Sequence, residues 1–366
     1  MNCHVLYYKS LILHLTNVTG VGSTQLLLSL LPALERHSSV EISEIHLPDK
    51  GHLSNYHKLT NGALSKRYKR RLPNALSRIM ECLFSARNLN GDTPLLVLGD
   101  IPLHCRVPQT VFVQNPHLLV PFSIDWSLKG LKFAILRLLF RLNARYANSF
   151  IVQTSFMHDA LAASYPEIAN KIHVIAQPVP IWLLNVTKKN NGAHRKIDSK
   201  GMKLIYPAAS YAHKNHRLLG YIEPELGLTW PVECLKITLS KDKHPAPNVS
   251  WIQCVGVLSA PEIIQAYLDV DGLLFLSTDE SYGFPLIEAM FMGIPVVCPD
   301  LPYAHELCSD GAIYFDPNSI ASLNEAIGIL NSLLLEGWWP DWTKQLSFLP
   351  KNWDVVADSM IAVSCA

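Results

Sequence analysis

The sequence predicts an α/β protein with two domains, each built around a parallel β-sheet. Short apolar segments rich in β-branched residues alternate with helical patterns along the chain, which is typical of β-α-β units. The chain has 366 residues, more than one hydrophobic core usually serves. A polar, basic stretch at residues 187–201 separates two sets of such segments and is interpreted as a linker.

The expected elements follow this division in order. Strands are predicted in the first half at residues 11–15, 40–47, 94–99, 109–114, 149–153 and 171–176. Strands are predicted in the second half at residues 203–208, 235–239, 249–254, 272–277, 295–298 and 312–315. The predicted domains are therefore 1–186 and 202–348, and residues 349–366 include a helical pattern at 353–363.

Bulk composition indicates a soluble protein of the cytoplasm. Hydrophobic residues make up 49% of the chain and charged residues 17%, but no apolar run approaches the ~20 residues of a membrane-spanning helix. Leu11–Leu15 lacks the basic region and cleavage site of a signal peptide and is predicted to be a buried strand. The eight cysteines show no paired spacing, which argues against a zinc site and for reduced thiols.

The most informative segment is Thr278–Met290, which contains Glu280 and Glu288. An apolar run precedes it and a helical pattern follows, so it reads as strand, glycine turn and helix. Gly283 allows close approach of the backbone to a ligand, and Pro285 suits the first turn of a helix. The free N–H groups of such a helix end attract phosphate, and the two carboxylates can accept sugar hydroxyls. The alternative is an ordinary turn with two solvated glutamates.

The surrounding residues narrow this choice. The stretch E-S-Y-G-F-P-L-I-E-A-M-x-x-G-I-P-V-V resembles the signature of retaining glycosyltransferases of family 4, also called glycosyl transferases group 1. Four further segments, covering roughly residues 11–360 in the order of that family, extend the resemblance. They are the glycine loop Asn17–Gly22, the active-site segment Asn115–His117, the donor-phosphate lysine segment Tyr206–His216 and the nucleotide-side loop Val255–Ser259.

The resemblance implies the GT-B fold: two Rossmann-like domains facing across a cleft, with a C-terminal helix that returns to the first domain. It implies transfer of a sugar from a nucleotide diphosphate sugar to a glycan or lipid-linked acceptor, without a metal or other cofactor. The implied catalytic residues are His117, Lys214 and Glu280. The implied donor-binding residues are Gly22, Lys214, Gly283, Phe284, Leu286 and Glu288.

Two features depart from this pattern or compete with it. Many relatives carry an arginine about four residues before the lysine, where this chain has Ser210, and Arg217 or His213 are the candidates to replace it. Asp269-Val-Asp271 mimics a metal-binding pair but precedes its strand, so we expect two exposed acids at a helix-to-strand junction.

Three other functions stay open: a nucleotide-sugar epimerase, an inverting transferase with His117 as base, and a non-catalytic nucleotide-sugar-binding relative.

Charge is distributed unevenly. Residues 1–183 carry a net +8 and residues 184–366 a net −7. Basic residues gather at 65–87 and at 128–145, where Arg137, Arg141 and Arg145 lie at four-residue spacing beside an apolar face predicted to comprise residues 131, 135, 138, 139 and 142. Such a basic helix suits an anionic membrane surface, and the alternative is a core-packing helix with a solvated outer face.

The charge pattern and the resemblance together predict where the protein works. No aromatic-interleaved motif accompanies the basic residues, so nucleic acid is not expected as a partner. We expect a cytoplasmic enzyme held peripherally on the inner face of the cell membrane. The resemblance implies bacterial assembly of a surface polysaccharide, such as O-antigen or capsule.

Overall fold

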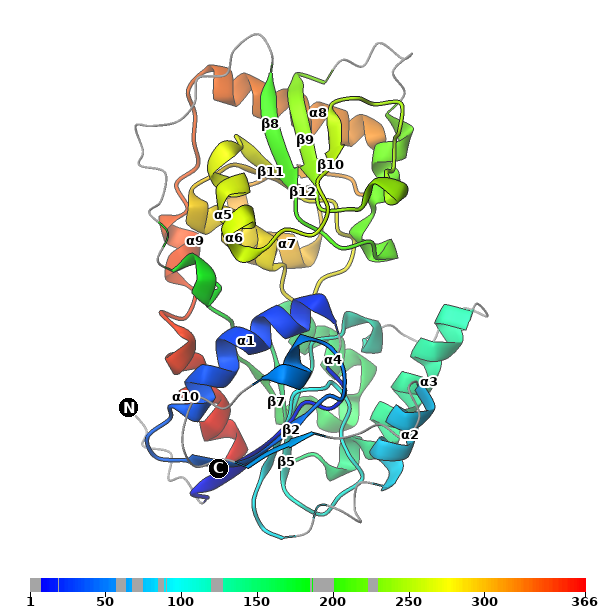
Figure 1. Cartoon of the computed structure of the whole chain (residues 1–366), viewed down its shortest axis with the longest axis vertical. Coiled ribbons are helices and arrows are strands. Elements are labelled where there is room, and N and C mark those ends of the chain that lie inside the picture. The colour runs from blue at the N-terminus through cyan, green and yellow to red at the C-terminus, as the bar shows by residue number, and fades with distance from the viewer. Residues whose placement is uncertain are drawn as a thin grey trace. The chain divides into compact units, whose positions relative to one another are not determined.

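The chain folds into two compact units (Figure 1). The computed structural model describes residues 8–18, 20–56, 64–67, 75–84, 89, 91–119, 128–184, 186, 201–222 and 230–366. Unit 1 comprises Met1–Pro178 and Pro350–Ala366, and unit 2 comprises Val179–Leu349. The first boundary lies at Pro178 rather than at residue 186, and of the predicted linker only Gly201 is among the described residues.

Unit 1 contains a seven-stranded parallel sheet in the order β3-β2-β1-β4-β5-β6-β7. The strands are β1 (Ser10–His14), β2 (Glu41–Leu47), β3 (Leu64–Arg67), β4 (Leu95–Val97), β5 (Gln109–Phe112), β6 (Ser149–Val152) and β7 (Ile172–Val174). The order of the strands reverses between β1 and β4. In open parallel sheets, ligands bind at the carboxyl ends of the strands near such a reversal.

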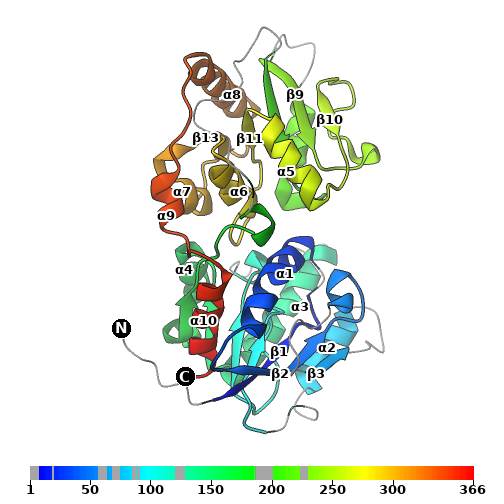
Figure 2. The same cartoon turned by 60° about the vertical axis from the view of Figure 1, so that its left-hand side comes forward.

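The helices of unit 1 cover this sheet. They are α1 (Val21–Glu35), α2 (Ala75–Phe84), α3 (Leu128–Asn143), α4 (Ser155–Ser164) and α10 (Trp353–Ser364), with short 3₁₀ turns η1 (His52–Asn55), η3 (Pro116–Leu118), η4 (Ala144–Tyr146) and η5 (Pro166–Lys171). Helix α10 lies beside α1 (Figure 2), where Arg36 Nη2 is 2.7 Å from Asp354 Oδ1. Its side chains Trp353, Val356 and Met360 are buried, so α10 is part of the core of unit 1.

Unit 2 contains a six-stranded parallel sheet in the order β10-β9-β8-β11-β12-β13. The strands are β8 (Met202–Tyr206), β9 (Val232–Ile237), β10 (Ile252–Cys254), β11 (Gly272–Leu274), β12 (Val296–Pro299) and β13 (Ile313–Phe315). The helices are α5 (Ala260–Asp269), α6 (Phe284–Met292), α7 (Pro302–Cys308), α8 (Ile320–Leu335) and α9 (Thr343–Ser347). Shorter 3₁₀ turns are η6 (Ile181–Leu183), η7 (Ala212–Lys214), η8 (His216–Tyr221), η10 (Lys241–Lys243) and η11 (Ser309–Gly311). Here the order reverses between β8 and β11, so the loops after these strands mark the expected ligand site.

Every strand predicted from the sequence is present, usually shorter than expected, but β3 was missed. Strand β3 occupies residues within the first basic cluster, where Ser65, Lys66 and Arg67 give no apolar signal. It pairs only with β2 and therefore lies at the edge of the sheet. Edge strands commonly carry charged side chains, because one side of the strand is not paired within the sheet.

The predicted acid pair also differs from expectation at one position. Asp271 is fully buried, not exposed, and its Oδ2 accepts a hydrogen bond from the backbone N–H of Lys203 at 2.8 Å. Asp269 is exposed and accepts from Gln265 Nε2 at 2.8 Å. Asp271 therefore joins the start of β8 to β11.

Candidate active site

A glycine turn opens helix α6 at the carboxyl edge of the unit 2 sheet. Gly283 has φ 86° and ψ 53°, a left-handed conformation that is strained for any residue with a side chain. Pro285 lacks an N–H group, and the amide of Leu286 donates to the carbonyl of Gly283 at 2.9 Å. Among the described residues, no hydrogen bond involves the amides of Gly283 and Phe284, which leaves these two for an anion.

Lys214 and Glu280, predicted from two separate motifs, form an ion pair. Lys214 ends the turn η7 after β8, and Glu280 lies in the loop after β11. Lys214 Nζ contacts Glu280 Oε1, and the two side chains are only 15% and 13% exposed. Partial burial makes such a pair stronger than one on an open surface, because water screens the charges less.

Backbone and side-chain hydrogen bonds hold the two loops together. The carbonyl of His213 accepts from the amide of Thr278 at 2.7 Å and from the Ser277 hydroxyl at 3.2 Å. The hydroxyl of Tyr206, a buried residue at the end of β8, donates to the carbonyl of Lys214 at 2.8 Å. Asn215 then takes a left-handed conformation, φ 51°, that ends the turn. The lysine is therefore held in place by the loop after the neighbouring strand.

Asp279 is a second acid in this cluster, and it was not predicted from the sequence. The pKa of Asp279 is raised to about 6, mainly by burial and also by the nearby charge of Glu280, and Lys214 opposes the shift. Lys214 is therefore needed to balance two acids at neutral pH. The sequence does show Asp279 next to Glu280, which could have suggested a second acid at the site. The burial of Asp279, however, depends on the fold and could not be read from the sequence.

Glu288 is one turn into α6 and is 9% exposed. The Tyr267 hydroxyl on α5 donates to Glu288 Oε2 at 2.7 Å. Burial raises the pKa of Glu288 to about 7, and the Tyr267 hydrogen bond opposes the shift. Tyr267 was not predicted from the sequence.

The two candidates for replacing the missing arginine contact residues near Lys214. Ser210 itself is exposed. Arg217 is exposed, and its Nε contacts Asn215 Oδ1 at 3.4 Å. The ring of His213 stacks on Tyr211 with 5.7 Å between ring centroids. Lys214 is the cation that forms an ion pair with Glu280.

His117 lies at the carboxyl edge of the unit 1 sheet. The side chain of Asn115 accepts from the His117 amide at 3.1 Å, and the His117 ring lies 4.3 Å from that of Phe133, between centroids. Burial lowers the pKa of His117, and the charges of Arg137 and Lys132 lower it further. The imidazole is therefore neutral at physiological pH.

Partly buried Asp100 supports the backbone before His117. It follows β4 with φ 70°, and its Oδ1 accepts from the amide of Gln114 at 2.7 Å. A left-handed non-glycine residue is unusual and marks a turn that the surrounding structure holds in place. Asp100 therefore links the loops after β4 and β5.

Gly22 lies inside a helix, although it was predicted to lie in the glycine loop Asn17–Gly22. Helix α1 begins at Val21, so Gly22 is in its first turn, and Gly20 is the N-cap. Gly22 is exposed, and an added Cβ would meet no atom within 4 Å. The first-turn position keeps its amide near the positive end of α1.

Comparison with known proteins identifies the domain that contains the acid cluster. Residues 238–333 match the family model described as glycosyl transferases group 1. This range includes Glu280, Gly283 and Glu288.

Residues 238–333 therefore resemble a group 1 glycosyltransferase domain.

The chain is similar to bacterial mannosyltransferases. The O-antigen chain mannosyltransferase RfbU of Salmonella typhimurium is 25% identical over 261 residues, which are 65% of this chain and 67% of RfbU. The O-antigen chain mannosyltransferase B of Escherichia coli is 30% identical over 88 residues, 24% of this chain and 23% of that protein.

Solved structures establish the fold of the chain. WaaG, a glycosyltransferase involved in lipopolysaccharide biosynthesis, aligns with a TM-score of 0.64 at 11% identity over 96% of this chain and 99% of WaaG. Anabaena Alr3699/HepE in complex with UDP and glucose aligns with a TM-score of 0.58 at 14% identity, over 97% of this chain and 96% of HepE. The predicted architecture, two Rossmann-like parallel-sheet domains of the GT-B fold, is confirmed.

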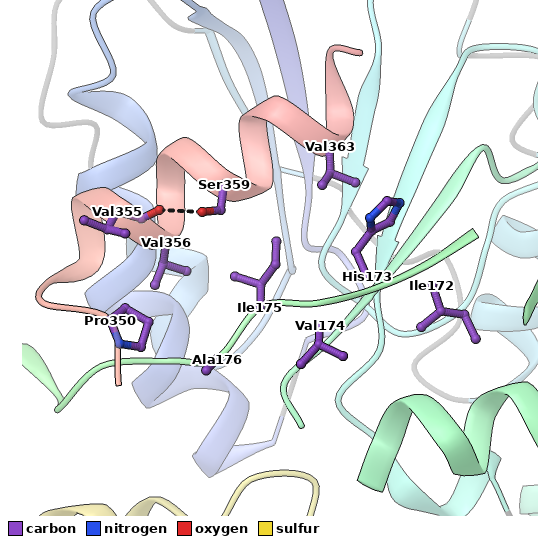
Figure 3. Close-up of a pocket in the computed structure, with 10 residues that line it drawn as sticks. All are labelled: Ile172, His173, Val174, Ile175, Ala176, Pro350, Val355, Val356, Ser359 and Val363. Atoms are coloured by element: carbon purple, nitrogen blue, oxygen red, sulfur yellow. Dashed lines mark hydrogen bonds between the residues drawn. The ribbon is translucent and has the colours of Figure 1, made fainter. Parts of the chain in front are cut away.

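A cavity elsewhere in unit 1 lacks the chemistry of an active site (Figure 3). It has a volume of about 530 Å³ and lies between β7 and α10. Aliphatic side chains dominate its lining, and the hydroxyl of Ser359 is engaged by the carbonyl of Val355 at 2.9 Å. Burial lowers the pKa of His173, which keeps that ring neutral. The cavity contains none of the residues that we predicted to bind substrate.

Helix α3, the predicted basic helix, differs from the prediction in the exposure of one arginine. Helix α3 has the predicted bounds within two residues, but Arg137 is buried and its Nη1 donates to the carbonyl of His117 at 3.3 Å. Leu131, Leu138 and Leu142 are exposed instead. Residues 65–87 are outside the described residues except for the backbone of β3 and parts of α2. No helix in the described part of the chain is long and apolar enough to cross a bilayer.

Proposed function

We propose that the protein is a retaining hexosyltransferase that moves a sugar from a nucleotide diphosphate sugar to an acceptor hydroxyl. The observation that carries this proposal is the Lys214–Glu280 pair beside the glycine turn of α6. It supplies a cation, an anion-binding helix end and a carboxylate within one loop cluster. Those groups suit a diphosphate and the hydroxyls of the sugar attached to it.

In the proposed reaction, the acceptor oxygen attacks the anomeric carbon on the face that the diphosphate leaves. The bond from that carbon to the phosphate oxygen breaks, the bond to the acceptor oxygen forms, and the leaving phosphate oxygen takes the acceptor proton. Lys214 and the amides of Gly283 and Phe284 stabilise the negative charge on the departing diphosphate. Glu280 orients the sugar, Glu288 holds the ribose, and neutral His117 contacts the reacting sugar.

The sugar and the pathway are proposed from the relatives. RfbU and the E. coli protein are named O-antigen chain mannosyltransferases, so we propose mannose as the transferred sugar and a lipid-linked O-antigen glycan as the acceptor. Lys214 and the amides of Gly283 and Phe284 can stabilise the negative charge of a diphosphate, so we propose that no metal is required.

The proposed reaction is tested with a panel of donors. The protein is incubated with UDP-, GDP- and dTDP-sugars and a lipid-linked acceptor extract, and the products are weighed and assigned by NMR. We expect one donor to extend the acceptor with retained configuration, and we expect turnover to persist in EDTA. Inverted products would favour an inverting transferase. An altered free donor without acceptor would favour an epimerase, and donor binding without turnover would favour a non-catalytic relative.

We further propose that unit 1 attaches to an anionic membrane surface. Adjacent helices α2 and α3 (Figure 1) expose large apolar side chains, each 47–56% exposed: Leu76, Met80, Phe84, Leu131, Leu138 and Leu142. The exposed cations Lys132, Arg141 and Arg145 lie on or next to α3. An interfacial helix combines these two properties, because apolar side chains enter the bilayer while cations meet anionic headgroups.

A vesicle experiment tests this attachment. The protein should co-sediment with vesicles of phosphatidylglycerol and phosphatidylcholine at low salt, but not with phosphatidylcholine alone. It should release near 1 M salt, where the Debye length falls to ~3 Å. Changing both Leu138 and Leu142 to serine should weaken binding to the vesicles about tenfold or more, because the change removes two apolar side chains that would be buried in the bilayer. Leu335→Ser, at an exposed leucine on α8, is the matched control and should bind normally. Equal binding by both variants would contradict the proposal.

A further inference from the structure

Helix α6 buries a carboxylate where an apolar side chain would be more stable. Its residues Leu286, Ile287, Ala289 and Met290 are at most 1% exposed, and Glu288 lies among them at 9% exposure. Burying a carboxylate costs free energy unless hydrogen bonds or charges compensate. A group retained at such a position points to a functional role.

One hydrogen bond orients this carboxylate. The Tyr267 hydroxyl donates to Glu288 Oε2 at 2.7 Å, and Tyr267 is itself 0% exposed on α5. Within the described residues, no hydrogen bond involves Oε1 of Glu288. Tyr267 therefore fixes one oxygen and leaves the other to accept from a ligand.

We propose that Tyr267 is a positioning residue for nucleotide binding, whose hydroxyl holds the Glu288 carboxylate so that its second oxygen accepts the ribose hydroxyls. The inference rests on the proposed function, because it requires a nucleotide at this site. The tyrosine also favours the ionised carboxylate, which accepts hydroxyl protons better than the neutral acid.

The surroundings of Glu288 connect this role to pH. Burial raises its pKa to about 7, and Tyr267 is the group that opposes the rise. Tyr303 and Cys308 on α7 and Cys298 on β12 are also buried on elements that pack against α6. Other titratable side chains on these packed elements are exposed: Glu262, Asp269, His305, Glu306 and Lys344. Nucleotide binding should therefore be strong above pH 7 and weaken below it.

Titration calorimetry across pH 5.5–8.5 tests the inference with whichever of UDP or GDP the wild-type protein binds. Tyr267→Phe keeps the ring but removes the hydroxyl. We expect its binding midpoint to move up by about one pH unit and its affinity at pH 7 to fall threefold to tenfold. Glu288→Gln should leave only the pH dependence that comes from the nucleotide phosphates. Tyr56→Phe is the matched control, because Tyr56 donates to Glu35 Oε2 at 2.6 Å in unit 1, and it should behave as wild type.

A nucleotide without ribose hydroxyls separates this effect from other titrations. The 2′,3′-dideoxy diphosphate keeps the same phosphates, so its pH dependence reports them alone, and Tyr267→Phe should not change its affinity. Superimposed pH curves for wild type and folded Tyr267→Phe with the normal nucleotide would overturn the inference. Failure of the wild type to bind any nucleotide would instead overturn the proposed function.

Discussion

Replacing Lys214 with alanine is expected to lower the rate of sugar transfer roughly a hundredfold to a thousandfold, the usual cost of losing one preorganised charge-stabilising group. The change removes the cation proposed to meet the leaving diphosphate. It also leaves Glu280 without its ion-pair partner and raises the pKa of Asp279 further above about 6, because Lys214 opposes that shift. Without Lys214, the carboxylates of Glu280 and Asp279 would repel the negatively charged diphosphate.

Steady-state kinetics with the preferred donor measure this effect. Lys344→Ala, at an exposed lysine on α9, is the matched control and should retain full activity. Glu280→Gln removes the acid but keeps Lys214, so it should lower turnover while the protein still binds the free nucleoside diphosphate. Wild-type turnover in a folded Lys214→Ala protein would remove Lys214 from the proposed mechanism.

Replacing Glu288 with glutamine is expected to flatten the pH dependence of stability. The folded-state pKa of Glu288 is about 7, whereas an unfolded glutamate has a pKa near 4.5. Between these values the folded protein holds a proton that the unfolded chain has lost. Glu288 therefore stabilises the fold below the unfolded pKa, and that contribution is lost as the pH rises towards 7. The loss across this window is on the order of 3 kcal/mol, which the glutamine variant should not show.

Denaturant unfolding monitored at pH 5 and pH 8 measures this difference. Glu325→Gln, at an exposed glutamate on α8, should keep the wild-type dependence. If Glu288→Gln loses as much stability as wild type between the two pH values, the buried carboxylate does not titrate in this range.

The strands and the glycine turn were predictable because each depends on local sequence. Apolar runs rich in β-branched residues mark strands, and a left-handed position before a helix requires a residue such as Gly283. The Tyr267–Glu288 hydrogen bond was not predictable from the sequence. It joins residues 21 positions apart on two different helices, and no local sequence pattern connects them. The burial of Arg137 was missed for a similar reason. Helical periodicity predicts which face of the helix carries its side chain, but not that the side chain donates to the carbonyl of His117 in another loop.

The placement of α10 has a consequence for synthesis of the chain. Unit 1 contains Met1–Pro178, which is translated before unit 2, yet it also includes Pro350–Ala366, whereas unit 2 is a continuous segment. Unit 2 can therefore finish folding while unit 1 still lacks the helix that covers α1. The region translated first is completed last, and until then the surface of α1 that α10 will cover is open to chaperones or to misassociation.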